Sequence, residues 1–193
     1  MHYVIGAYQA KVRQIQAYAF AMTDLYEDFI ARCRSMLEET LETSVYQGTV
    51  HTRGKTRHRL VLWSKEFLDH LREATDDNQR CYPARNPAER RDYLSGVLDA
   101  RGSVSHSPHI SALGHPLEYP RIIVTKNNPN LIASLGVLCR SIGIEPTLDE
   151  TVLRIHRLSD MRRIIRHGLL RQPEKRDHLQ KLYGNVKEYQ EIA

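Results

Sequence analysis

The stretch YLSGVLDARGSV, residues 93–104, decides the fold of this chain. An apolar helical segment ends there in Asp-Ala-Arg-Gly, and the start of a strand follows. A weaker copy, YVIGAYQAKV, lies at residues 3–12, with Gly6 at the position that Gly96 has in the other copy. Small residues at these positions let two helices pack backbone to backbone, so we expect the two copies to contact each other.

The two copies belong to a repeat that spans the chain. ARCRSML at 31–37 matches VLCRSIG at 137–143, and SKEFLDHL at 64–71 matches SDMRRIIR at 159–166. Both halves have the order helix, two strands, helix, two strands, helix. Repeats of roughly a hundred residues are duplicated half-domains rather than solenoid units.

This order predicts an α+β fold, a tandem pseudo-twofold repeat of α-β-β-α-β-β-α half-domains whose two antiparallel sheets form a saddle. We place the N-terminal half-domain at residues 1–77 and the C-terminal half-domain, with an extra C-terminal helix, at residues 88–193. Residues 78–87 contain two prolines and little apolar matter, which is typical of a linker.

Local patterns in the first half predict individual elements. Residues 11–22 alternate polar with apolar side chains and predict a strand. The helical pattern that follows is expected to be capped by Thr23 or Asp24. Residues 43–50 and 59–64 read as two strands joined by a glycine-centred turn, which predicts a hairpin.

The composition fits a folded, weakly basic protein. Of the 193 residues 41% are hydrophobic, and 28 Lys and Arg against 23 Asp and Glu give a net charge of +5. This balance favours a polyanion partner such as nucleic acid. The three cysteines form no C-x-x-C pair, and no apolar run approaches the roughly 18 residues of a membrane helix. We therefore expect an intracellular protein, in the cytoplasm, the nucleoid or an organelle matrix, with no membrane partner.

YLSGVLDARGSV resembles the signature helix of the LAGLIDADG homing endonucleases, and YVIGAYQAKV is similar to a weaker first copy. The resemblance covers the whole chain, because single-chain members of that family carry this duplication. It implies that Gly6, Ala7, Ser95 and Gly96 form the interface between the half-domains, beside a pseudo-twofold axis. It also implies an acidic residue at each helix end that holds a divalent metal, and sheets that lie along the major groove of DNA.

The chain departs from that family at the metal-binding position. The eighth letter of the motif is Lys11 in one copy and Arg101 in the other, while the sixth letter is Gln9 and Asp99. A Mg²⁺ ion about 4 Å from such a cation would feel a repulsion of roughly 8 kcal/mol at an effective dielectric of about 20. We therefore predict no catalytic residues, no metal and no cofactor, with Mg²⁺ required only if the chain is a nuclease. Two alternatives stay open: the cations merely favour the negative ends of helix dipoles, or an acid such as Asp99 or Glu118 serves the site.

Basic and histidine side chains supply the candidate nucleic-acid contacts. HTRGKTRHR, residues 51–59, gathers cations on one hairpin, although basic edges also protect sheets from aggregation. SHSPHISALGHPLEYPR, residues 105–121, is typical of a long hairpin, and its histidine spacing matches no standard zinc pattern. The candidate contacts are Lys11, Arg13, Arg53, Lys55, Arg57, Arg59, Arg101, His106, His109, Arg121 and Lys126.

These observations predict a nucleic-acid-binding protein on a LAGLIDADG scaffold without cleavage activity, such as a regulator, an RNA maturase or a ribonucleoprotein component. GSVSHSP, residues 102–108, is also similar to a stretch of the bacterial regulator family WhiA, although no helix-turn-helix pattern follows it here. The expected partner is double-stranded DNA or structured RNA, bound by a monomer with an internal pseudo-dimer. The alternatives are an active Mg-dependent, site-specific homing endonuclease and a protein interaction module that binds no nucleic acid.

Overall fold

The computed structural model describes residues 1–11, 15–16, 19–52, 54–74, 84–110, 114 and 116–192. The first half of the chain contains α1 (His2–Ala10), β1 (Ile15–Gln16), β2 (Ala19–Asp24), α2 (Glu27–Leu41), β3 (Tyr46–Thr52), β4 (Lys55–Leu62) and α3 (Lys65–Ala74). The second half contains α4 (Pro87–Arg101), β5 (Gly102–Ile110), β6 (Pro116–Thr125), α5 (Pro129–Ser141), β7 (Thr147–Asp149), β8 (Val152–Ile155) and α6 (Leu158–Arg166), followed by α7 (Pro173–Ile192).

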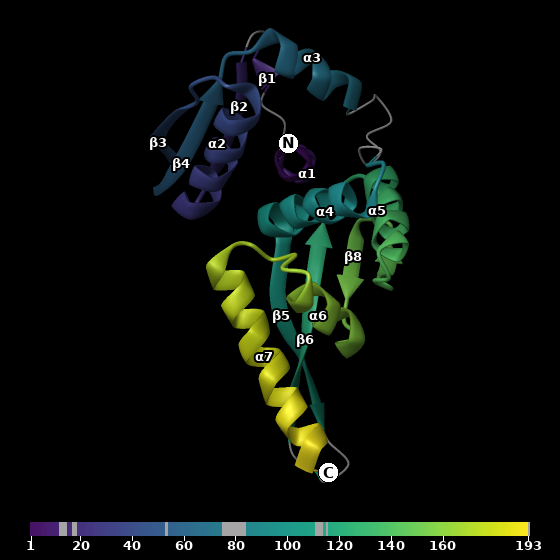
Figure 1. The fold of residues 1–193 in the computed structure, drawn as a ribbon. Coiled ribbons are helices and arrows are strands. Elements are labelled where there is room, and N and C mark those ends of the chain that lie inside the picture. Colours follow the sequence, from purple (N-terminus) through teal and green to yellow (C-terminus); the bar gives the residue numbers. More distant parts are fainter. Residues whose placement is uncertain are drawn as a thin grey trace.

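Each half forms a four-stranded antiparallel sheet. The strand orders are β1-β2-β4-β3 and β5-β6-β8-β7, so the second half repeats the topology of the first. The predicted α+β fold with two repeats is therefore confirmed. Figure 1 shows α1 and α4 where the two halves meet. The predicted linker at 78–87 falls largely outside the described residues, and the half-domain boundaries stay predictions.

Two expectations for the first half are wrong in detail. The separate strands β1 and β2 take the place of the single strand expected over residues 11–22. Thr23 and Asp24 lie in β2 and pair with β4, so neither caps α2, which begins at Glu27. The Asp24 carboxylate instead accepts a hydrogen bond of 3.1 Å from the backbone N–H of Tyr26. The strand continues past the expected boundary because its pairing with β4 continues there.

The β3–β4 hairpin extends further than the strands predicted at residues 43–50 and 59–64. β3 and β4 pair from Tyr46 opposite Val61 to Thr52 opposite Lys55, and Gly54 adopts a φ of 72° in the turn. A positive φ is favourable for glycine, which has no Cβ. Most of the basic segment therefore belongs to β4, where alternate side chains point to the same face of the sheet.

The additional helix α7 covers one side of the β5–β6 hairpin, as Figure 1 shows. Leu179, Leu182 and Val186 of α7 are buried. Leu179 belongs to the same apolar cluster as Ile122 and Val124 of β6, so α7 extends the core of the second half. Among the described residues, no helix combines the length and the apolar character needed to cross a membrane.

The contact between α1 and α4, which we call the seam, joins the two halves. A Cβ built on Gly6 would lie 2.1 Å from the carbonyl oxygen of Tyr93, and one built on Gly96 would lie 1.9 Å from that of Tyr3. Both distances are far shorter than a real Cβ contact, so any side chain at either position would force the helices apart. The two contacts are reciprocal, which places the pseudo-twofold axis between them.

Two further small residues complete the seam. Ala7 and Ser95 are fully buried, next to Gly6 and Gly96 in the sequence. The Ser95 hydroxyl donates a 2.8 Å hydrogen bond to the carbonyl oxygen of Arg91, one turn earlier in α4. Its only polar side-chain group is thus satisfied within its own helix, so Ser95 needs no hydrogen-bond partner on α1.

We expect Gly96→Ala to destabilise the protein by about 3 kcal/mol, because the methyl group would overlap the Tyr3 backbone and overpack the seam. Gly184→Ala is the matched control, since a Cβ on this α7 glycine meets nothing within 4 Å. Alanine should stabilise that helix by about 0.5–1 kcal/mol. Urea unfolding of both variants measures the difference, and equal stabilities would contradict the geometry of the seam.

Candidate nucleic-acid interface

Each sheet has a core face that packs on helices and an opposite face, which we call the open face. In β6, Ile122 and Val124 are buried in the core, so the alternate residues Arg121 and Ile123 lie on the open face. In β4, Leu60 and Leu62 belong to the core cluster, and their alternates lie on the open face. The register of the paired strands then assigns the remaining strand residues to one face or the other.

Three predicted contacts lie in a row on the open face of the first sheet. Lys55, Arg57 and Arg59 are alternate residues of β4, and we call them the β4 row. The Nε atoms of Arg57 and Arg59 are buried and have no hydrogen-bond partner among the described residues. Both side chains are half-buried, so an anion that approaches the sheet would meet the exposed part of each guanidinium group and not its Nε atom. Arg53 and Arg13, two further predicted contacts, lie outside the described residues.

The open face of the second sheet is polar. Arg121 of β6 is paired with Ser105 of β5 and donates a 2.9 Å hydrogen bond from Nε to the Ser105 hydroxyl. The His109 ring packs edge-on against the Tyr119 ring, with centroids 5.0 Å apart. These side chains offer neutral donors and acceptors and one guanidinium group.

The structure separates the two predicted histidines. His106 is paired with Pro120, which shares the core face with Ile122, so His106 points away from the open face. Its Nε2 lies 3.4 Å from a carboxylate oxygen of Glu118. His109 points to the open face with Arg121. His106 and His109 are three residues apart in one strand, so strand alternation alone predicts that they point to opposite faces of the sheet.

Lys11 is the C-cap residue of α1, and its side chain extends toward β2. Its ammonium group donates to the carbonyl oxygen of Thr23 at 3.0 Å and forms an ion pair with Asp24. Burial lowers the pKa of Lys11 to about 7, and the nearby cations Lys175 and Arg101 act in the same direction. The Asp24 carboxylate opposes this shift and helps to keep the ammonium group charged.

Cationic side chains also donate hydrogen bonds to the last backbone carbonyl groups of α1 and α4. Arg101 Nε donates to the carbonyl oxygen of Ala10 at 3.1 Å, and Lys126 Nζ donates to the same oxygen at 3.1 Å. Lys175 of α7 donates to the carbonyl oxygen of Leu98 at 3.2 Å and also to that of Asp99. Helix C-termini leave such carbonyls without intrahelical partners, and their partial negative charge favours cations.

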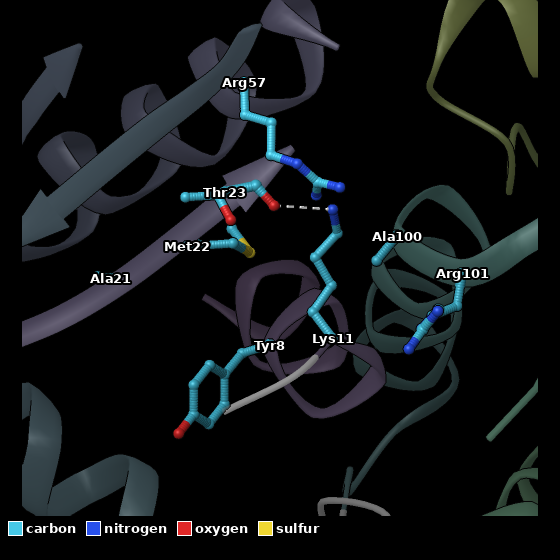
Figure 2. A pocket seen from close by; sticks show the side chains of 8 residues that line it. All are labelled: Tyr8, Lys11, Ala21, Met22, Thr23, Arg57, Ala100 and Arg101. Carbon is cyan, nitrogen blue, oxygen red and sulfur yellow. Dashed lines mark hydrogen bonds between the residues drawn. The ribbon is translucent and has the colours of Figure 1, made fainter. Parts of the chain in front are cut away.

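Lys11, Arg57 and Arg101 line an open hollow of about 190 Å³ between β2, β4 and the ends of α1 and α4. Figure 2 shows Lys11 extending toward Thr23, while Arg57 reaches down from β4 toward the same point. Arg101 lines the opposite side of the hollow from α4. The arrangement gathers three positive side chains where the two halves meet, and the β4 row continues from Arg57.

Asp99, the acid that survives from the motif, is not available at this hollow. It is 2% exposed and accepts a 2.7 Å hydrogen bond from the hydroxyl of Tyr3. It also accepts the backbone N–H groups of Arg171 and Gln172, just before α7 begins, at 3.1 Å each. Burial raises the pKa of Asp99, and the hydrogen bond from Tyr3 acts against that shift. The carboxylate therefore anchors α7 to the seam.

The pseudo-twofold axis repeats this contact with a neutral acceptor. The Tyr93 hydroxyl donates to the side-chain oxygen of Gln9, as the Tyr3 hydroxyl donates to Asp99. Gln9 and Asp99 both occupy the sixth letter of their motif copies. The sixth letter thus serves the packing of the seam in both halves.

The residues at the seam do not fit a divalent metal. Asp24 is held by Lys11, and Asp99 is buried under Tyr3 and the start of α7. In the described part of the chain, no three His, Cys, Asp or Glu side chains are grouped as metal ligands would be. Lys11 and Arg101, the eighth letters of the two motif copies, are cations that would repel the ion.

Sequence reasoning missed Asp24 and Lys175. Asp24 resembled a helix cap, and only its strand pairing reveals that it faces Lys11. Lys175 lies far along the chain from the carbonyl groups that it contacts, so no local sequence pattern predicts the contact. The helical spacing of buried leucines in α7 predicts a packed helix, but it does not predict where that helix docks.

The paired glycine-containing helices and the repeated sheets define a protein with the two-repeat LAGLIDADG fold. No protein-family model matches the chain, and no curated protein matches its sequence. The evidence for the fold is therefore structural.

Solved structures share this fold at low sequence identity. A mesophilic variant of the homing endonuclease I-DmoI is similar with a TM-score of 0.57 and 17% identity, over 89% of this chain and 98% of that one. I-DmoI in complex with DNA and Mn gives a TM-score of 0.52 at 16% identity, over 88% and 98%. The N-terminal LAGLIDADG domain of WhiA gives 0.57 at 14% identity, over 92% and 87%.

We expect Tyr3→Phe to cost about 2 kcal/mol of unfolding free energy, because the lost hydrogen bond ends on a carboxylate. Tyr93→Phe is the matched variant on the other side of the axis and should cost about 1 kcal/mol, because its acceptor is a neutral amide. Both rings stay buried, so the comparison isolates the hydroxyl groups. Urea unfolding provides the measurement. A larger loss for Tyr93→Phe would show that Asp99 is not held as a charged acceptor.

Proposed function

We propose that this protein binds helical nucleic acid, duplex DNA or structured RNA, on the open faces of its two sheets and does not cut it. The observation that carries the proposal is the continuous set of cations formed by the β4 row and the seam residues Lys11 and Arg101. These side chains come from both halves and line one connected surface. The protein would act as a binding component, such as a regulator, a maturase or part of a ribonucleoprotein.

The electrostatics support a phosphate backbone as the ligand. Arg57 and Arg59 are partly exposed on the open face, and guanidinium groups form strong bidentate hydrogen bonds with phosphate oxygens. A two-stranded ribbon such as β3–β4 also has the width to enter a major groove. Phosphate contacts fix position, while base edges supply sequence information.

The second sheet has side chains that suit contacts with base edges. Ser105, His109 and Arg121 present hydroxyl, imidazole and guanidinium groups on its open face. Groups of this kind donate to and accept from base edges. The similarity to I-DmoI, which has been solved in complex with DNA, supports nucleic acid as the ligand.

The seam supports binding without cleavage. Phosphodiester hydrolysis on this scaffold would need carboxylates that hold a metal between the helix ends. Here Lys11 and Arg101 occupy those positions, and the nearest acid, Asp24, is paired with Lys11. Cations at the seam instead suit the close passage of a backbone.

We expect binding to fall steeply with salt. About six phosphate contacts give a slope of about −5 in a plot of log affinity against log salt concentration. Changing the β4 row to alanine (Lys55→Ala, Arg57→Ala, Arg59→Ala) should reduce the slope to about −3, since each contact contributes about 0.9. Fluorescence anisotropy with a labelled duplex measures both quantities.

The control for that experiment changes three exposed cationic residues of α6 and α7 to alanine: Arg162, Arg166 and Lys181. This triple alanine variant has the same net charge as the β4-row variant, so it separates a local contact from a general charge effect. We expect its slope to stay near that of the unmodified protein. Equal losses in the two variants, or a flat salt response, would contradict the proposed binding face.

We expect no site-specific cleavage. Duplexes retained by the protein from a random library are incubated with Mg²⁺ or Mn²⁺, and their ends are sequenced. Recurrent double-strand ends that disappear with EDTA and in Asp24→Asn would establish a nuclease and overturn this part of the proposal. Random ends at the background level agree with a protein that binds only.

A further inference from the structure

An exposed aromatic pair lies at the end of the β4 row. Tyr46 is 58% exposed and Trp63 is 65% exposed, with ring centroids 6.4 Å apart and an interplanar angle of 57°. Tyr46 is paired with Val61, which is an alternate residue of the β4 row, and Trp63 follows two positions later. Both rings therefore lie on the open face of the first sheet.

A glycine provides the seat for one of these rings. A Cβ built on Gly48 would lie 2.6 Å from the Tyr46 hydroxyl oxygen and 3.0 Å from its ring carbons. The Tyr46 ring thus lies over the bare backbone of Gly48 in β3, where a side chain at position 48 would displace it. More than half of Tyr46 stays open to solvent.

The cations and the rings follow one line along the strand. Alternate residues of a strand are about 6.6 Å apart, twice the rise of about 3.3 Å per residue. Lys55, Arg57 and Arg59 occupy successive steps of this line, Val61 the next, and Trp63 the last. A nucleic-acid strand that follows the line would meet charge along its backbone and then an aromatic surface.

From this arrangement we propose that the first sheet selects nucleic acid with an unpaired base next to a helical segment. The base would stack on Trp63 and Tyr46, and the β4 row would hold the neighbouring phosphates. Stacking on an aromatic side chain requires a base that is free of its own helix stack. The inference deepens the proposed function and rests on it, because the unpaired base is recognised only if the open face binds the backbone.

The surroundings of the rings favour a polyanion over a protein partner. Residues 46–63 contain no Asp or Glu, and they contain one Lys and three Arg. An exposed apolar patch alone would suit many partners. Its continuity with the cations of the β4 row is typical of surfaces that combine backbone contacts with base stacking.

Trp63 is the only tryptophan in the chain, so its fluorescence reports on this site alone. The probes are hairpins with one bulged adenosine and fully paired hairpins of the same length, each made as RNA and as DNA. We expect the bulged probes to quench Trp63 fluorescence and to bind about tenfold more tightly in anisotropy measurements. A preference in both RNA and DNA assigns the selectivity to the unpaired base, and a preference in RNA alone assigns it to an RNA bulge.

Variants connect the preference to the rings. Trp63→Ala should remove the tenfold preference for bulged over paired hairpins, while Trp63→Phe should retain part of it. Gly48→Ala should weaken the preference by displacing the Tyr46 ring. The matched control is Val137→Ala on α5, which changes a side chain that is also 65% exposed but lies far from the β4 row in sequence and on another element.

The outcomes separate this inference from the proposed function. Equal affinity for bulged and paired probes without quenching overturns the inference, while a loss of both affinities in the β4-row variant keeps the proposed function. A preference that survives Trp63→Ala also overturns it. If no probe binds even at low salt, both proposals fail, and the aromatic pair would then be a surface for another class of partner.

Discussion

The close approach of α1 and α4 at Gly6 and Gly96 is the constraint on which the rest of the structure depends. Because neither residue has a Cβ, each helix reaches the backbone of the other, and the two C-termini emerge side by side. The hydroxyl groups of Tyr3 and Tyr93 then bond across the seam in a reciprocal way. The geometry of the seam is thus set by small residues and buried hydrogen bonds. The Gly6 and Gly96 contacts lie before the helix tips in the sequence, so this packing does not itself require a particular residue at Lys11 or Arg101.

The tips of α1 and α4 are surrounded by cationic side chains. Arg101 and Lys126 donate to the end of α1, and Lys175 donates to the end of α4, so the cations meet a need that every helix end has. Asp99 accepts the N–H groups that begin α7 and so fixes the additional helix to the seam. A metal site between the tips would compete with both arrangements. The positive charge at the seam and the docking of α7 therefore depend on the same contacts at the helix ends.

Much of the fold could be predicted because its signals are local. The spacing of small residues around Gly96 indicates helix packing, and the repeated order of elements indicates two halves. The candidate site was harder, since its side chains meet through tertiary structure. Strand alternation in β4 does place Arg57 and Arg59 on one face, and the same rule applied to β5 separates His106 from His109. The end of β2 at Asp24 and the path of the chain from α6 to α7 depend on long-range contacts that no local pattern encodes.

The two open faces are chemically unequal, and this inequality bears on recognition. The first carries the β4 row with an aromatic pair, whereas the second carries hydroxyl and imidazole groups with fewer cations. Backbone contacts add affinity that depends on salt and not on sequence, while neutral polar groups add discrimination at smaller gain in affinity. A pseudo-symmetric scaffold with such faces would treat the two halves of its ligand differently. The first face would supply most of the salt-dependent affinity, and the second face would supply most of the discrimination between bases.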